Sequence, residues 1–190
     1  ITKALSGEIG FKEYLEKVDA YYKNGLDSGY EGDFKTEVEC VEAAKAVYAL
    51  CLNESLSKHG QDIGTEQVII ENLANILIYA YVGDSTLSRV IQNKDLYVKK
   101  NQVVPELCAK VYTAEQGIRV MEYANKILNS IYDGEVPKEL ESKFAKLSKR
   151  LSLSTDTIGL KKIIGEKVVE AGGYPCLLYT SDAADDVHRV

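Results

Sequence analysis

Histidine is scarce in this sequence: only His59 and His188 occur among 190 residues, and tryptophan is absent. The scarcity excludes zinc sites built from several histidines. No Glu-x-x-His pair occurs, which excludes the di-iron carboxylate sites of helical bundles. His59, in SLSKHGQDIG, is the one base left for a Ser-His-Asp arrangement. Its place among polar residues at a helix end favours a solvated role instead.

Proline is also rare, and no strand-like alternation of useful length is present. The common residues include Ala, Leu, Glu and Lys, which are good helix formers. A glycine-rich phosphate loop needs a preceding strand, so this class of site is excluded as well. The sequence therefore predicts an all-α fold, an antiparallel helical bundle of about five to six helices.

Basic clusters and long apolar runs are missing too. The net charge is −6 and no basic stripe is available to meet phosphates, which argues against a nucleic-acid role. The longest apolar run is broken by Glu71, Asn72 and Asn75, so no transmembrane span is expected. The sequence has four cysteines and no CxxC pair: Cys40, Cys51, Cys108 and Cys176. We interpret them as small buried hydrophobes in a reducing compartment.

Helical periodicity and turn residues mark six helical segments. The first runs from Ile1 to about Tyr22, and a glycine-rich, acidic loop follows over Asn24–Phe34. The others run over about Thr36–Lys58, Thr65–Asn93, Pro105 to a stop at Asp133-Gly134, Pro137–Arg150, and Thr155 to a stop at Gly172-Gly173. Thr36 and Thr155 are expected to cap their helices, and Pro105 suits a first helical position. The last helix is expected to bury Leu160, Ile163, Ile164, Val168 and Val169.

The segment Thr65–Asn93 carries the clearest pattern. Its apolar and small residues recur at alternating steps of four and three, which predicts a packing seam of Ile69, Leu73, Ile76, Ala80, Gly83, Leu87 and Val90. Ile70, Leu77 and Tyr81 widen this apolar surface. We therefore predict that this helix lies centrally in the bundle.

A polar cluster, Tyr81 to Arg89 (YVGDSTLSR), interrupts that apolar helix. Gly83 lies on the seam, which predicts the close approach of another helix. The charges of the cluster need partners, because an unpaired charge at a packed surface costs stability. We interpret five residues as interhelical or interdomain docking residues: Tyr81, Gly83, Asp84, Ser85 and Arg89. A role in ligand contact is the alternative. We assign no catalytic, cofactor-binding or metal-binding residue.

The same cluster resembles a Tyr-Val-x-acid-Ser-x-Leu-x-Arg pattern in the C-terminal helical domain of large, very-long-chain-type bacterial acyl-CoA dehydrogenases. KHGQDIGTEQVIIENLANILI is similar to a helix entry of that domain, and ITKALSGE and IGEKVVEAGGYP are similar to its two ends. The resemblance covers Ile1–Pro175. It implies an accessory, structural C-terminal domain whose catalytic domain is missing upstream.

The resemblance also implies what the complete enzyme does. It would oxidise the α,β bond of a fatty acyl-CoA in fatty acid β-oxidation with bound FAD, and pass electrons to an electron-transfer flavoprotein. The base and the flavin contacts would lie upstream, so no residue here inherits a catalytic role and this fragment holds no cofactor. A homodimer in a bacterial cytoplasm is implied.

Other interpretations stay open. The chain is alternatively a free-standing helical protein-interaction module, or a small α-helical enzyme centred on His59. The lysine-rich face of Pro137–Arg150 is the candidate for peripheral contact with a membrane surface, although an ordinary solvated helix explains it more simply. The acidic loop Asn24–Phe34 would be repelled by anionic lipid.

The last stretch, Cys176–Val190, has no helical period. CLLYTSDAADD resembles the conceptual translation of a transposase adapter used in sequencing libraries. We interpret 176–190 as an artefactual disordered tail, with a natural disordered tail as the alternative, and exclude it from fold reasoning.

Overall fold

The computed structural model describes residues 11–99 and 102–172. Within these residues every regular element is a helix and no strand is present, so the all-α prediction is confirmed. The elements, in chain order, are α2 (Phe11–Asn24), α3 (Lys35–His59), the 3-10 helix η1 (Gly60–Thr65), α4 (Gln67–Gln92), α5 (Lys94–Lys99), α6 (Val104–Ile131), α7 (Lys138–Leu151) and α8 (Thr157–Glu170).

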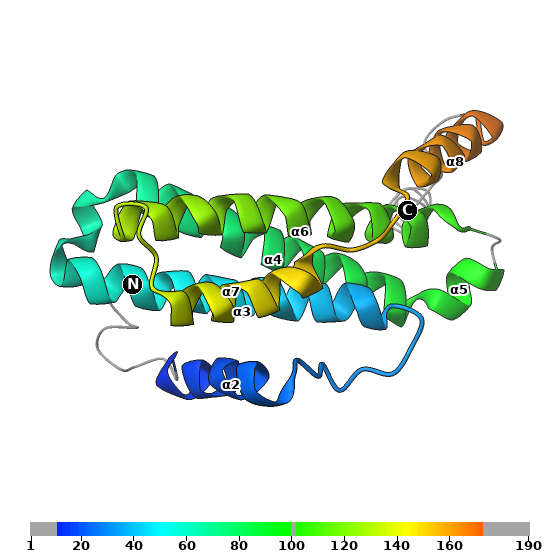
Figure 1. Ribbon diagram of the computed structural model, residues 1–190. Coiled ribbons are helices and arrows are strands. Elements are labelled where there is room, and N and C mark those ends of the chain that lie inside the picture. The colour runs from blue at the N-terminus through cyan, green and yellow to red at the C-terminus, as the bar shows by residue number, and fades with distance from the viewer. Residues whose placement is uncertain (1–10, 100–101, 173–190) are drawn as a thin grey trace, which may run out of the picture.

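Four helices, α3, α4, α6 and α7, lie side by side, and each runs antiparallel to the one before it (Figure 1). A tight turn reverses the chain between α6 and α7, where Asp133 and Gly134 have positive φ angles of 52° and 84°. The predicted stop at this dipeptide is confirmed. The six-residue α5 was not predicted, because so short a helix carries no readable period.

Helix α3 is the centre of the bundle, and it contacts α2, α4, α6 and α7. Its middle is rich in alanine, and Ala43, Ala46 and Ala49 are at most 1% exposed. Small side chains let several neighbours approach one helix closely. The prediction that Thr65–Asn93 is the central helix is therefore wrong: α4 lies beside α3 and leaves one side open to solvent.

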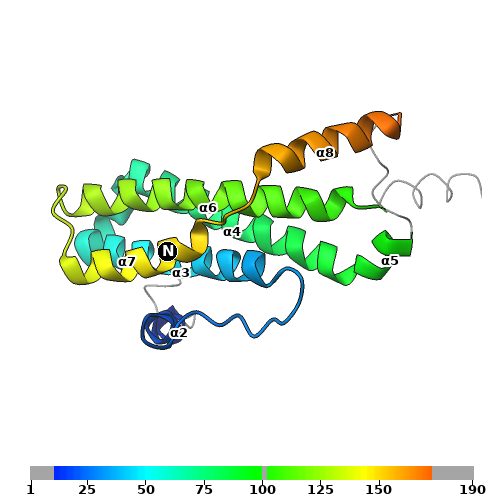
Figure 2. The ribbon, with the colours of Figure 1, turned by 45° about the vertical axis from the view of Figure 1, so that its right-hand side comes forward.

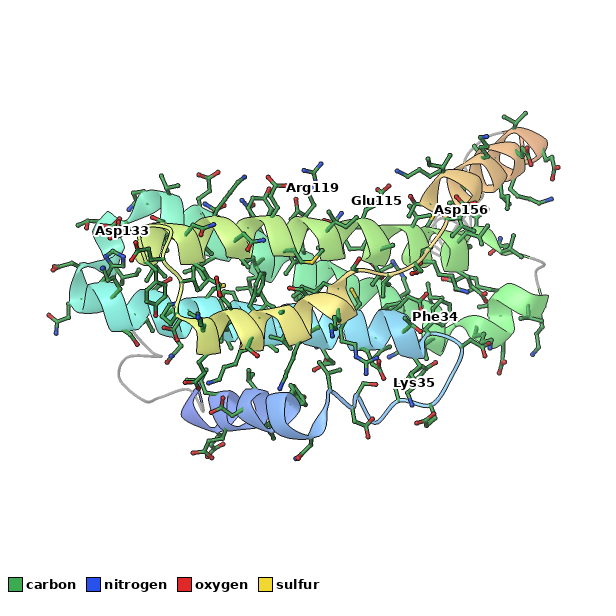
Figure 3. All side chains as sticks on the ribbon, viewed as in Figure 1. Phe34, Lys35, Glu115, Arg119, Asp133 and Asp156 are labelled. Atoms are coloured by element: carbon green, nitrogen blue, oxygen red, sulfur yellow. The ribbon has the colours of Figure 1, made fainter. Side chains whose placement is uncertain are left out.

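The packing seam predicted on α4 is confirmed. All seven of its residues are buried: Ile69, Leu73, Ile76, Ala80, Gly83, Leu87 and Val90. A second, smaller core forms at the end of the bundle, where Phe34 is 1% exposed and packs with Val41, Leu87 and Tyr97 (Figure 3). This cluster holds the loop before α3 and the short α5 against the ends of the long helices.

Helix α8 departs from the prediction. None of its fourteen residues, all of them described, is buried, and Val169 is 79% exposed. The helix packs against α6 and projects from one end of the bundle (Figures 1 and 2). An ion pair between Lys161 and Glu115 joins the two helices. The expected burial of Leu160, Ile163, Ile164, Val168 and Val169 is wrong: Ile163 and Val169 are exposed and the other three are half-buried, because the described part of the chain supplies no second wall for the helix.

Two predicted caps are also wrong. Helix α3 begins at Lys35, whose N–H bonds to the Gly32 carbonyl, and no side chain caps it. Asp156, and not Thr155, caps α8 by accepting a hydrogen bond from the Gly159 N–H. Pro105 does occupy the first turn of α6. The predicted stop at Gly172-Gly173 is described in part: α8 ends at Glu170, and Gly172 has a positive φ angle of 69°. The start of the first helix over 1–10, Gly173 and the tail over 176–190 lie outside the described residues.

Candidate docking surface

Gly83 lies where α4 meets α3. A Cβ placed on it would stand 2.9 Å from the Val41 Cγ2 atom of α3 and 3.9 Å from the Tyr112 ring of α6. Real Cβ atoms essentially never approach a neighbour this closely. Gly83 thus permits the close approach that its place on the seam predicts.

Asp84 is tied to the central helix. Its Oδ1 atom lies 3.3 Å from Lys45 Nζ of α3, and the same ammonium lies 2.7 Å from Glu42 Oε1. Burial works against the charged form of Lys45, but the hydrogen bonds and charges of Glu42 and Asp84 outweigh it and raise the Lys45 pKa. The Asp84 charge is therefore used between helices of this chain.

The other three predicted docking residues, Tyr81, Ser85 and Arg89, face solvent, with Tyr81 70% exposed. Ser85 and Arg89 are exposed on the same side, since positions 78, 81, 82, 85 and 89 share one helical face. We call this surface the outer α4 face and define it by Leu77, Ile78, Tyr81, Val82, Ser85 and Arg89. The five predicted docking residues thus fall into two groups. Gly83 and Asp84 contact α3, and Tyr81, Ser85 and Arg89 lie on the outer α4 face.

The outer α4 face is apolar along two helical turns. Leu77 is 46% exposed, Ile78 53% and Val82 36%, beside Tyr81. Single exposed apolar residues are normal on a soluble protein. Four adjacent ones on one helix form a patch of the kind that marks contact with another protein surface. This geometry suits docking against another protein surface.

Among the described residues, those around His59 form no catalytic arrangement. Its Nδ1 atom lies 3.7 Å from Glu66 Oε1, and its side chain is 20% exposed, so the expected solvated position is wrong. The nearby Ser55 hydroxyl donates to the Cys51 carbonyl at 2.7 Å. The described residues contain no group of three or more His, Cys, Asp or Glu side chains placed to hold a metal ion.

The cysteines divide into two classes. Cys40 and Cys51 are buried, as predicted. Burial, reinforced by the negative charge of Glu37, raises the pKa of the Cys40 thiol to about 12, and burial likewise raises that of Cys51. Cys108 is exposed, which contradicts the prediction, because it lies on the outer side of the first turns of α6. Cys176 lies outside the described residues.

Comparison with known families shows to which family this helical bundle belongs. A sequence model described as "Acyl-CoA dehydrogenase, C-terminal domain" matches residues 43–145, more than half of the chain. The chain belongs to the acyl-CoA dehydrogenase family. The match runs from α3 into α7 and so includes the whole of α4. The predicted resemblance to the C-terminal domain of an acyl-CoA dehydrogenase and the interpretation as an accessory domain are confirmed.

The fold of this acyl-CoA dehydrogenase C-terminal domain is similar to part of a solved structure. That structure is an acyl-CoA dehydrogenase complexed with FAD from Bacillus anthracis, and the similarity has a TM-score of 0.77 at 20% sequence identity. It covers 92% of this chain and 29% of the Bacillus anthracis chain. A search of curated proteins gave no significant match. Among the described residues, no helix is both long and apolar enough to span a membrane.

Three residues at the surface of this domain were not predicted from the sequence. Ile78 and Val82 complete the outer α4 face, and Lys45 is the partner of Asp84. Ile78 and Val82 could have been predicted, because Ile78 stands three residues before Tyr81 and Val82 three residues before Ser85, on one helical face. Lys45 was not readable, since its pairing with Asp84 depends on how α3 and α4 pack.

Proposed function

We propose that this domain is the accessory C-terminal part, over 1–175, of an FAD-dependent acyl-CoA dehydrogenase, and that its outer α4 face packs against the upstream catalytic part of the same polypeptide. The exposed apolar side chains of that face carry the proposal, because the bundle leaves them uncovered. The small share of the Bacillus anthracis chain that this domain spans supports a large upstream region.

The proposal extends to the complete protein. It uses FAD to oxidise the α,β bond of a fatty acyl-CoA in β-oxidation, and it passes electrons to an electron-transfer flavoprotein. It is a homodimer of the bacterial cytoplasm. The domain described here supplies no catalytic group. Its helices position the catalytic part and support the dimer, with Tyr81, Ser85 and Arg89 on the docking side and Gly83 and Asp84 fixing α4 to α3.

Cysteine footprinting tests the docking face. Cys108 and Cys176 are replaced by serine, and Tyr81→Cys is alkylated in this chain alone and in the complete polypeptide. We expect the rate to fall at least tenfold in the complete polypeptide, because a docked side chain is shielded. Asn125→Cys, an exposed position on α6, serves as the control and should react alike in both.

Two results would overturn the proposal. Equal rates at position 81 in both proteins would show that the upstream part does not cover the outer α4 face, and would favour a free-standing interaction module. Visible flavin absorbance retained by the purified 190-residue chain would contradict the accessory role, because the cofactor is assigned to the upstream part.

A further inference from the structure

Helix α8 has an exposed surface of its own, separate from the outer α4 face. Ile158, Lys162, Gly165 and Val169 follow one another at steps of four, three and four residues, so they lie along one side of the helix. Glu166 lies beside them, and all five residues are exposed. Ile158 is 70% exposed and Val169 79%. We call this surface the outer α8 face.

The charges of α8 divide into those used within the chain and those that face outward. Lys161 is paired with Glu115 of α6. Lys162 and Glu166, on the outer α8 face, form no ion pair with any of the residues that the structure describes, although the charge of Glu166 acts on its neighbour Lys167. One cation and one anion, four residues apart, are therefore presented to the outside.

The outer α8 face is complementary to itself. Two copies of α8 can lie antiparallel about a two-fold axis level with residue 164. Lys162 and Glu166 lie two residues on either side of that axis, so Lys162 of each copy stands opposite Glu166 of the other. The symmetry makes this ion pair occur twice. Ile158 of one copy then lies near Val169 of the other, so the apolar ends of the face meet as well.

The centre of the outer α8 face permits a close approach. A Cβ placed on Gly165 would meet nothing within 4 Å, so the space above this residue is open. A position without a side chain lets the backbone of another helix come near. Because α8 projects from one end of the bundle (Figures 1 and 2), a second helix can lie along it.

The size of this surface sets how strongly two copies can pair. A helix of 14 residues is about 21 Å long, and one face of it buries less than the ~800 Å² per partner of a stable interface. Exposed ion pairs also contribute little each. Pairing through α8 is therefore weak by itself and adds to other contacts between two copies.

We propose that the outer α8 face pairs antiparallel with the same face of a second copy of this chain, with two reciprocal ion pairs between Lys162 and Glu166 and with Gly165 near the axis. The proposal rests on the proposed function in one respect, since it names a contact of the homodimer given there. It does not involve the outer α4 face.

Disulfide cross-linking of the full 190-residue chain tests the pairing, with Cys108 and Cys176 replaced by serine. Gly165→Cys places a thiol near the two-fold axis, so oxidation should link two copies. Ile163→Cys is the control, because residue 163 is also exposed but lies about 160° around the helix from residue 165. We expect the linked dimer to form at least fivefold faster with the thiol at position 165.

Charge reversal tests the antiparallel register. In the Gly165→Cys chain, Lys162→Glu and Glu166→Lys should each slow cross-linking at least fivefold, because each sets like charges opposite one another. Glu166→Lys also lowers the net negative charge of the chain, so general repulsion alone would speed its cross-linking instead. In a mixture of the two variants every Glu faces a Lys, so mixed dimers, identified by mass, should form within twofold of the original rate.

Three results would overturn the proposal: equal rates at positions 163 and 165, charge reversals that leave the rate unchanged, or a mixture that forms mixed dimers no faster than each variant forms its own. Unchanged circular dichroism establishes that each variant is folded. Failure here leaves the docking of the outer α4 face intact, because the footprinting at position 81 compares this chain with the complete polypeptide and does not depend on α8.

Discussion

At Gly117 three helices meet more closely than any side chain allows. A Cβ on this residue would lie 2.0 Å from the Leu151 carbonyl oxygen at the end of α7 and 3.2 Å from Cys40 Sγ on α3. The obstacle is mainly backbone, which cannot rotate out of the way as a side chain can. A glycine inside a helix usually has such a packing reason, and this general signal is the only one the sequence gives.

The first prediction compares two glycines. Gly117→Ala should destabilise the protein by about 1–3 kcal/mol, because it overpacks the junction of α3, α6 and α7. Gly165→Ala in α8 meets nothing within 4 Å and should stabilise by up to ~1 kcal/mol through helix propensity. Urea unfolding measures both. The same sign of effect in the two variants would contradict this account of the packing.

A second prediction concerns alkaline pH. The Tyr132 hydroxyl donates to Glu54 Oε2 at 2.6 Å, and this hydrogen bond, aided by burial and by the charge of Glu54, raises the Tyr132 pKa to about 12. The folded state thus holds the proton more tightly than the unfolded chain, whose tyrosine pKa is about 10. The added stability is complete below pH ~10 and is lost as pH rises towards 12.

Tyr132→Phe tests this assignment. At pH 8 the variant should unfold about 1–2 kcal/mol more easily, because it lacks a hydrogen bond to a carboxylate. At pH 11 the difference from the unaltered protein should shrink. Other tyrosines titrate in the same range, so the comparison between the two proteins is the informative quantity. A constant difference from pH 8 to pH 11 would show that Tyr132 is not the group responsible.

At the scale of helices, the sequence predicted well which residues of a helix share a buried face. It predicted poorly which other surface covers that face. The α4 seam was correct residue by residue, because periodicity shows which side chains share a face. The predicted central position of α4 was wrong. The sequence pattern of its second apolar side is the same whether this chain or another protein surface covers that side. The central role of α3 was hidden in alanines, which give little hydrophobic contrast along the sequence.

The burial predicted for α8 failed for the same reason. Ile158 is 70% and Ile163 42% exposed, although the helix carries enough apolar residues to predict burial. Periodicity states which residues favour burial and does not name the surface that buries them. An apolar helix at the edge of a domain is where sequence reasoning is weakest.

A third prediction follows for this helix. A chain that ends at Thr155 should lose less than about 2 kcal/mol of unfolding free energy, a minor part of the ~5–15 kcal/mol typical of a domain. The reason is that α8 contributes no fully buried residue. A chain that ends at Gly172 is the control, because it removes the following residues alone. Loss of cooperative unfolding in the shorter chain would show that α8 is part of the core.

At the scale of the whole molecule, the exposed apolar residues of the outer α4 face affect self-association. The outer α4 face leaves Ile78 and Tyr81 in water, and such a patch promotes association. We therefore expect the isolated chain to self-associate at high concentration. The double variant Ile78→Ser, Tyr81→Ser should weaken this association severalfold in sedimentation equilibrium, while Asn125→Ser on α6 should not. Equal association of the two variants would assign it to another surface.

The alanine-rich middle of α3 has a consequence for how this domain can change over time. Because α2, α4, α6 and α7 all pack against α3, a larger side chain on α3 would displace several of these helices at once. Selection should therefore remove substitutions that enlarge side chains on α3 unless a second substitution compensates for the added volume. Substitutions on α8 should have little effect on stability. Tolerance to mutation should rise from the axis of the bundle towards its projecting end.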